Sequence, residues 1–186
     1  STPNESSAAS DVYKRQHITQ YAVQRDPSDI AVGDLDCDGD NDIVSASAMG
    51  HFITTLYNDG SGGFADRQDV FISNNNSQRA GFVDTANGVD VEVGDINGDG
   101  TNDIIYYQEN IRFVGETFVR PGNLTVLWGD CNGAVNTWSD TAITISNPYH
   151  ISMEVGDIND DGNDDIVLVS IDGTFSNQYI QVYRGP

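Results

Sequence analysis

Three short acidic segments with one shared pattern constrain this chain more than any other feature. They read GDLDCDGDNDI at residues 33–43, GDINGDGTNDI at 94–104 and GDINDDGNDDI at 156–166. Counted from the first aspartate, each loop has Asp or Asn at positions 1, 3, 5 and 9 and glycine at position 6. The copies lie 61 and then 62 residues apart. The chain is therefore a repeat protein built around three acidic loops.

This spacing suits a hard cation such as Ca²⁺, which takes six to eight oxygen ligands at about 2.3–2.6 Å. Alternate side chains point inward, and glycine at position 6 permits the sharp turn that closes the loop. The backbone carbonyl at position 7 supplies a further oxygen. The predicted ligands are Asp34, Asp36, Asp38, Asp42 and the carbonyl of Asp40; Asp95, Asn97, Asp99, Asp103 and the carbonyl of Thr101; and Asp157, Asn159, Asp161, Asp165 and the carbonyl of Asn163.

Electrostatic repulsion also favours a bound cation in these loops. Two carboxylates 4 Å apart repel by about 4 kcal/mol at an effective dielectric constant of about 20, and each loop holds several. The alternative is that Asp, Asn and Gly form ordinary solvated turns. Because the pattern occurs three times in register, we favour three calcium sites.

The residues that follow each loop exclude an EF-hand. An EF-hand ends with a bidentate glutamate at position 12 and leads into a helix, whereas position 12 here is Ser45, Tyr106 or Leu168. The sequences DIVSAS, DIIYYQ and DIVLVS that begin at position 9 are β-branched or aromatic, as in strands. The loops are therefore expected to join β-strands, which also argues against dockerin modules.

With the turn NDGSGGF at residues 58–64, these loops resemble FG-GAP or VCBS repeats, the calcium-loop blades of integrin α-subunit propellers and of many secreted bacterial propellers. The resemblance covers roughly Ile18 to the last residue and is specific at the three loops. It implies an all-β propeller of four-stranded antiparallel blades, in which the calcium loop joins the first two strands of each blade. It does not imply a particular ligand or reaction.

Hydrophobic patterning divides the chain into strands that fit this scheme. Residues 1–16 are expected to be a disordered or non-native tail, and residues 17–24 an outer blade strand. Blades follow at 27–73 and 88–147, with an incomplete blade at 148–186. Within them strands are expected at 30–33, 43–48, 52–57 and 64–72; at 89–94, 104–108, 124–128 and 138–145; and at 151–156, 166–171 and 179–183.

About three blades are thus expected, fewer than the usual minimum of four for a closed propeller. One explanation is that the chain is a fragment of a ring with six to eight blades. The alternative is a homodimer that completes a six-bladed ring, in which strand 18–23 pairs with strand 179–183 of the partner.

Composition narrows the partners and the location. With 8 basic against 29 acidic residues, nucleic acid is not an expected partner, and no apolar stretch is long enough to span a membrane. The weak affinity of such calcium loops suits the calcium concentration outside cells, which favours a secreted or surface-displayed protein. The two cysteines, Cys37 and Cys131, are expected to be free thiols, with a bond between them as the alternative.

Comparison of the repeats locates two insertions, at about 73–87 and 109–122. Both are expected at the end of the sheets opposite the cation loops. They contain three of the chain's seven arginines together with aromatic residues: Arg79, Phe82, Arg112, Phe113, Phe118 and Arg120. These residues form either a recognition surface for an extracellular carbohydrate or protein ligand, or ordinary variable loops whose aromatic side chains pack against the blades.

The sequence therefore predicts a non-catalytic, calcium-binding β-propeller module for extracellular binding or adhesion. The alternative is the propeller part of a secreted polysaccharide-degrading enzyme, because similar propellers occur in some polysaccharide lyases and hydrolases. We find no nucleophile motif and no acid–base pair outside the cation loops.

Overall fold

A computed structural model describes residues 18–48, 51–72, 86–110, 112–114, 117–119, 122–132, 137–145, 148–172 and 177–186. Every regular element in these residues is a β-strand, so the all-β prediction is confirmed for the described chain. These residues include no helix that could cross a membrane.

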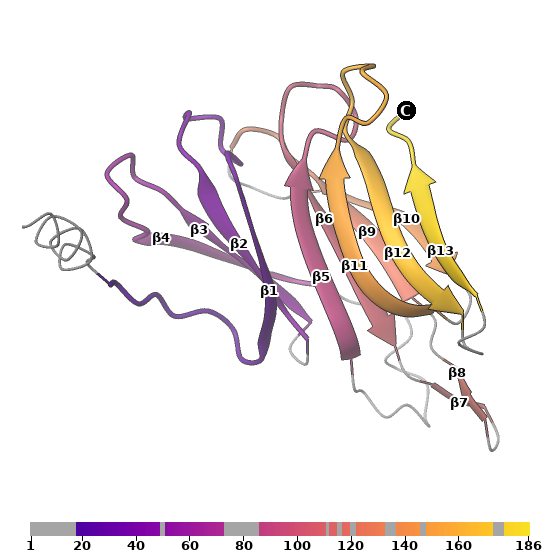
Figure 1. The fold of residues 1–186 in the computed structure, drawn as a ribbon. Helices are drawn as coiled ribbons and strands as arrows, with labels where there is room; N and C mark the ends of the chain where they lie inside the picture. The colour runs from indigo at the N-terminus through magenta and orange to yellow at the C-terminus, as the bar shows by residue number, and fades with distance from the viewer. Residues whose placement is uncertain are drawn as a thin grey trace, which may run out of the picture.

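The thirteen strands form three antiparallel sheets and one small ribbon (Figure 1). The first sheet has the order β1 (Pro27–Gly33), β2 (Asp42–Ser47), β3 (Phe52–Tyr57) and β4 (Asp66–Phe71). The second has the order β5 (Ala86–Gly94), β6 (Asp103–Asn110), β9 (Gly122–Trp128) and β10 (Thr137–Ile145). The third consists of β11 (Pro148–Gly156), β12 (Asp165–Asp172) and β13 (Gln178–Tyr183), and the ribbon pairs β7 (Arg112–Val114) with β8 (Thr117–Val119).

Eleven of these strands lie where the sequence predicts them, but the predicted strand at 17–24 is wrong in its described part. Residues 18–24 are not a strand. Instead they lie against β4, where Arg67 donates from Nη1 to the carbonyl of Ala22 over 2.8 Å and Gln24 donates to Asp69 over 3.0 Å. The alternating pattern read from the sequence indicates an extended chain, and it does not specify a strand partner.

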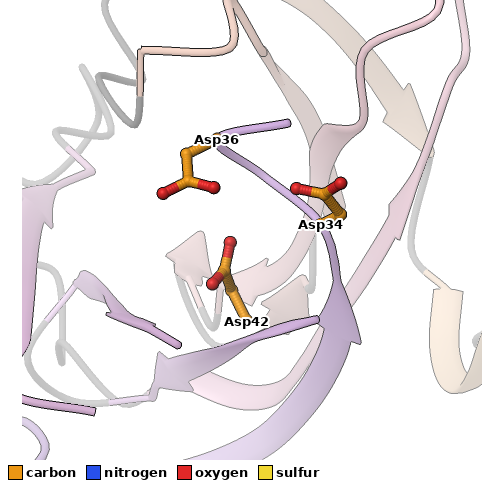
Figure 2. A group of neighbouring side chains, drawn as sticks. All are labelled: Asp34, Asp36 and Asp42. Carbon is orange, nitrogen blue, oxygen red and sulfur yellow. The ribbon is translucent and has the colours of Figure 1, made fainter. Parts of the chain in front are cut away.

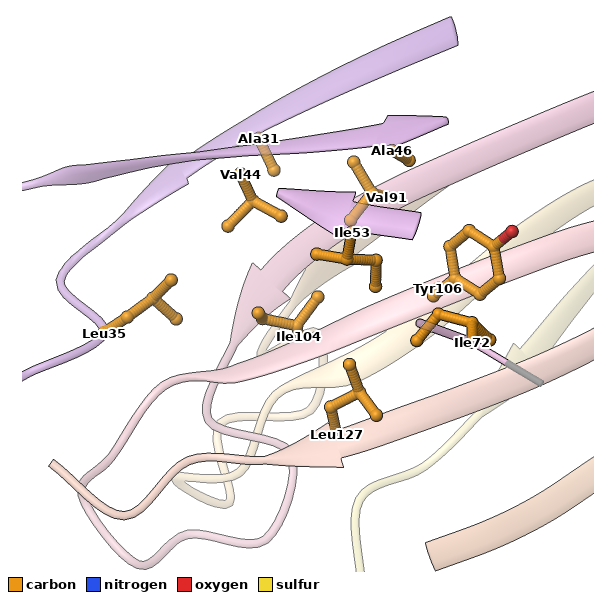
Figure 3. Packing of buried hydrophobic residues seen from close by; sticks show 10 residues of the cluster. All are labelled: Ala31, Leu35, Val44, Ala46, Ile53, Ile72, Val91, Ile104, Tyr106 and Leu127. Carbon is orange, nitrogen blue, oxygen red and sulfur yellow. The ribbon is translucent and has the colours of Figure 1, made fainter. Parts of the chain in front are cut away.

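The first two sheets pack face to face around a hydrophobic core (Figure 3). The first sheet and its connections contribute Ala31, Leu35, Val44, Ala46, Ile53 and Ile72, and the second contributes Val91, Ile104, Tyr106 and Leu127. A second core joins the other face of the second sheet to the third sheet. It contains Ile96, Ile105, Tyr107, Leu124 and Val126 with Met153, Ile166 and Leu168.

The central position of the second sheet explains the sequence of β6. Successive side chains of a strand point to opposite faces, so Ile104 and Tyr106 enter one core and Ile105 and Tyr107 enter the other. All four are buried. The apolar run IIYY therefore reflects a strand that is covered on both faces.

The sheets approach one another most closely through their first strands, since β5 contacts both β1 and β11. Here carboxylates of one strand accept hydrogen bonds from the next. Asp29 accepts from the backbone N–H of Val91 over 2.9 Å, and Asp90 accepts from that of Met153 over 2.6 Å. Burial, together with the neighbouring Asp29, raises the pKa of Asp90 to about 7. Burial and the charge of Glu154 raise the pKa of Glu92 to about 7 as well.

The strand order places the three acidic loops at one end of the sheets. Each loop joins the first strand of a sheet to the second, so all three lie at the upper end in Figure 1. The β7–β8 ribbon follows the far end of β6 and lies at the lower end. This is the predicted placement of the 109–122 insertion, and the 73–87 insertion lies almost wholly outside the described residues.

The raised pKa values of Asp90 and Glu92 predict a protein that is more stable at pH 5.5 than at pH 7.5. A raised carboxyl pKa means that the folded state binds protons more tightly than the unfolded state does. The stabilisation that comes from this proton binding is therefore full below about pH 4 and is lost as the pH rises through 7. After allowance for solvent screening, Asp90→Asn is expected to add about 1–2 kcal/mol at pH 7.5 and little at pH 5.5. Urea unfolding at both pH values measures this, with the exposed Asp66→Asn as control. Equal effects at the two pH values would contradict it.

Candidate metal centre

The three acidic loops share one pattern of hydrogen bonds at their first position. The position-1 aspartate accepts from the backbone N–H of the position-6 glycine. The distances are 3.0 Å for Asp34 and Gly39, 2.8 Å for Asp95 and Gly100, and 2.9 Å for Asp157 and Gly162. These glycines have φ of 94°, 85° and 93°, the left-handed region that glycine adopts most readily. The predicted sharp turn at position 6 is therefore present in all three loops.

Positions 3 and 5 also keep one geometry, because each side chain accepts a hydrogen bond from the backbone two residues later. At position 3, Asn97 and Asn159 each accept over 2.9 Å and Asp36 accepts over 3.3 Å. At position 5 the acceptors are Asp38, Asp99 and Asp161, over 2.9, 2.9 and 3.0 Å. These bonds turn the side-chain oxygens back toward the loop.

Position 4 is left-handed in every loop, which the sequence analysis missed. Cys37, Gly98 and Asp160 have φ of 62°, 70° and 59°. Gly98, and more weakly Asp160, signal this conformation in the sequence, whereas cysteine rarely adopts it.

The position-9 aspartates are buried, and each fastens its loop to the end of the sheet. Asp42 accepts from Leu35 N–H over 2.9 Å and from Asn58 N–H over 2.8 Å. Asp103 accepts from Ile96 and Gly129, over 3.1 and 2.9 Å, and Asp165 from Ile158 and Gly185, over 3.4 and 3.1 Å. In each case one donor is in the loop itself and the other follows the third strand of the sheet. These residues therefore have a structural role beyond the ligand role predicted for them.

The first loop brings three carboxylates together (Figure 2). One oxygen of each of Asp34, Asp36 and Asp42 lies within 4.8 Å of the others. Oδ1 of Asp34 is buried and has no hydrogen-bond partner among the described residues. Burial, with the charges of Asp42, Asp38 and Asp34, raises the pKa of Asp36. A buried carboxylate oxygen without a donor, beside two more carboxylates, is an environment that a hard cation would stabilise.

The other predicted ligands of the first loop lie outside this group of three. The side chain of Asp38 is exposed. Asp40 was predicted to contribute its backbone carbonyl and not its carboxylate, so it is not expected in a group of side chains. In the second and third loops position 3 is an amide, so fewer carboxylates can converge there. Hydrogen bonds from Thr101 lower the pKa of Asp99, and one from Gly162 lowers that of Asp157. The first loop is thus the strongest candidate for a metal site.

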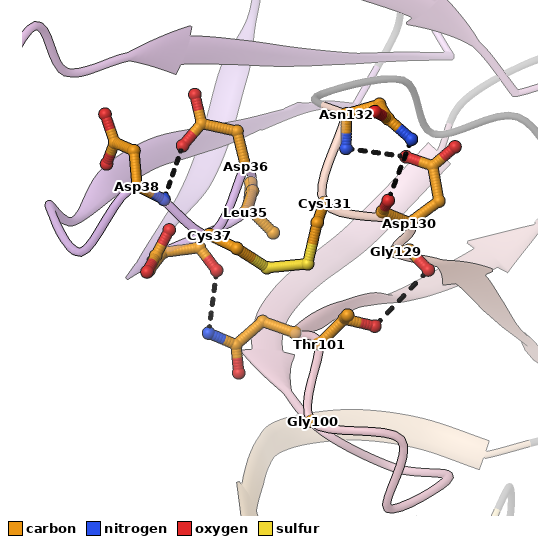
Figure 4. Close-up of a disulfide and its surroundings, with 12 residues drawn as sticks. Leu35, Asp36, Cys37, Asp38, Gly100, Thr101, Gly129, Asp130, Cys131 and Asn132 are labelled. Carbon is orange, nitrogen blue, oxygen red and sulfur yellow. Dashed lines mark hydrogen bonds between the residues drawn. A yellow bond between two sulfur atoms is a disulfide. The ribbon is translucent and has the colours of Figure 1, made fainter.

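The two cysteines are bonded to each other, so the expectation of free thiols is wrong (Figure 4). Cys37 and Cys131 have a Cα–Cα distance of 5.0 Å, typical of a disulfide. Cys37 is position 4 of the first loop, and Cys131 lies in the turn after β9 of the second sheet. The sequence does not show that packing of the two sheets brings this turn beside the first loop.

The residues predicted to bind an extracellular ligand are described only in part. Arg112, Phe113 and Phe118 lie on the β7–β8 ribbon, where Phe113 is paired with Phe118 and Arg112 with Val119. Arg79, Phe82 and Arg120 lie outside the described residues.

The sequence was compared with protein-family models and with curated proteins. No protein-family model matches the sequence, and no curated protein matches it.

Truncation of a position-9 aspartate is expected to destabilise the fold even without metal. Asp103→Ala leaves the N–H groups of Ile96 and Gly129 unpaired at a buried position, at a cost of about 3 kcal/mol. Asp103→Asn retains one acceptor and should cost about half as much. Urea unfolding in a chelator measures both, with the exposed Asp38→Ala as control. A change below about 0.5 kcal/mol for Asp103→Ala would rule out this role.

Removal of the disulfide, by Cys37→Ser with Cys131→Ser, is expected to lower the free energy of unfolding by about 2–4 kcal/mol. The bond joins residues 94 positions apart, so its loss frees a long segment of the unfolded chain. Thermal melting of the double variant, compared with the parent protein before and after reduction, tests this. Reduction that leaves the parent's melting temperature unchanged would contradict the prediction.

Proposed function

We propose that this chain is a calcium-stabilised β-propeller segment of an extracellular binding or adhesion protein, built from FG-GAP or VCBS repeats. The observation that carries the proposal is the threefold repetition of one loop geometry, together with the unpartnered, buried Oδ1 of Asp34 in the first copy. A solvated turn has no need to bury a carboxylate oxygen without a donor.

The sheet arrangement supports a propeller. Each sheet is an antiparallel meander, and adjacent sheets pack face to face with their first strands side by side. In a propeller the first strands surround the central axis, and the sheets radiate from it. The three acidic loops would then lie on one face of the ring.

Calcium suits the loops better than magnesium does. Calcium accepts flexible coordination by carboxylates, amide oxygens and carbonyls, whereas magnesium requires near-ideal octahedral geometry at about 2.0–2.1 Å. The loops offer mixed carboxylate and amide oxygens with an exposed position 5. We propose that the first loop, with four carboxylates against three in each of the others, binds calcium most tightly.

The disulfide supports an extracellular location, because such bonds persist mainly in oxidising compartments. For the binding role we propose the β7–β8 ribbon as part of the recognition surface. It projects from the end of the second sheet opposite the acidic loops (Figure 1) and carries Arg112, Phe113 and Phe118 on its strands. A carbohydrate or protein ligand could reach it while the cation loops remain filled.

Calcium is expected to raise the melting temperature, and a chelator to lower it. Each filled site adds about 2.7 kcal/mol when free calcium is a hundredfold above its dissociation constant. Asp36→Asn should weaken the tightest site seen by isothermal titration calorimetry, while Asp26→Asn, at an exposed position before β1 and at the opposite end of the sheet from the loop, should leave the titration unchanged. Identical melting with calcium and with chelator would refute the proposal.

A further inference from the structure

The two interfaces between neighbouring sheets use the same pair of residue types, a glycine and a valine, at equivalent positions. The last residue of the first strand is a glycine, and a valine of the next sheet packs onto it. A Cβ atom on Gly33 would overlap the Cγ1 methyl of Val93, and one on Gly94 would overlap that of Val155. Glycine is therefore required at these positions by the close approach of the next sheet.

Hydrogen bonds repeat across the same two interfaces. Asp29 and Asp90 accept backbone N–H groups from the next sheet, as described above. Position 8 of the second and third loops also reaches back to the preceding loop. Asn102 donates from Nδ2 to the carbonyl of Asp34 over 2.9 Å, and Asp164 accepts from the N–H of Asp95 over 2.9 Å.

The third sheet presents the same kind of face without a neighbour among the described residues. Gly156 is the residue equivalent to Gly33 and Gly94, and no atom lies within 4 Å of where its Cβ would be. On the same face of the sheet, on β13, Ile180 and Val182 are 72% and 45% exposed. They are paired with Val169 and Val167 on the side of the sheet away from Ile166 and Leu168.

The first sheet carries the complementary half. Ile30 and Val32 are 66% and 57% exposed, and they precede Val91 and Val93 by one repeat of 61 residues. In the second sheet these two valines pack against the first sheet. The segment before β1 lies over β4, through Arg67, and leaves Ile30 and Val32 uncovered.

We propose that the exposed face of the third sheet binds β1 of a second copy of this chain, head to tail. Val32 of the second copy packs onto Gly156, as Val93 packs onto Gly33 and Val155 onto Gly94. Asn41, which is position 8 of the first loop, reaches the backbone of Asp157 as Asn102 reaches Asp34. The interface continues one that the chain already forms twice. Two chains joined in this way at both ends would form a ring of six sheets, within the usual four to eight blades of a propeller.

Mass measurement by light scattering after gel filtration tests this. With a net charge of −21 the copies repel, so the buffer contains about 0.15 M salt, which reduces the Debye length to about 8 Å. The parent protein is expected at twice the mass of one chain. Gly156→Leu and Val32→Lys are both expected at the mass of one chain. Both sites are open in the single chain, so these variants should keep the parent's circular dichroism spectrum.

A matched control is Ala65→Leu, which adds the same apolar bulk at an exposed position before β4 and should remain dimeric. A second measurement combines Val32→Cys with Gly156→Cys. In the existing interface the Cβ of Val93 is 3.2 Å from the ideal Cβ position on Gly33, close to the Cβ separation of a disulfide. The double variant should therefore form a covalent dimer on a non-reducing gel, and neither single variant should.

A parent protein with the mass of one chain throughout the micromolar range, and no cross-linked product, would overturn the proposal. The proposal does not rest on cation binding, so the mass is measured with calcium and with chelator. A dimer in either buffer supports it, whatever the calcium titration of the loops shows.

Discussion

The structure depends first on the buried aspartate at position 9 of each loop. Its two carboxylate oxygens accept backbone N–H groups from the loop and from the chain that follows the third strand. One side chain thus joins the first, second and third strands at the end of the sheet. Without this link, two backbone N–H groups would be left unpaired there in a buried position, which is costly.

A second constraint is the large excess of acidic residues, because buried like charges repel and oppose packing. Most of the loop carboxylates point toward solvent or a prospective cation, and the cores between the sheets are apolar. Besides the buried position-9 aspartates, the exceptions are Asp29, Asp90 and Glu92 on the adjacent first strands, where like charges are close together. Asp29 and Asp90 offset that repulsion in part, because each accepts a backbone N–H from the neighbouring sheet.

Sequence alone predicted the elements that depend on local chemistry. Strand positions followed from β-branched runs such as DIVSAS, and the turn at Gly39 followed from its place in the loop. Features set by packing between repeats could not be predicted in this way. The pairing of Cys37 with Cys131 depends on the distance between two sheets, and the left-handed backbone of Cys37 is hidden by a residue type that does not favour it. The segment at 18–24 has a strand-like pattern, but the residues of the segment itself do not show whether another strand pairs with it.

The covalent link between Cys37 and Cys131 has a mechanical consequence. The 94-residue separation corresponds to about 300 Å of fully extended chain, at about 3.3–3.6 Å per residue. A pulling force on the two ends of the protein passes through the sulfur atoms, so this length cannot be drawn out. β1, β10 and the third sheet lie outside the linked segment and carry the load through their own strand pairing. Extension is therefore confined to these parts, while the chain between the two cysteines remains tethered.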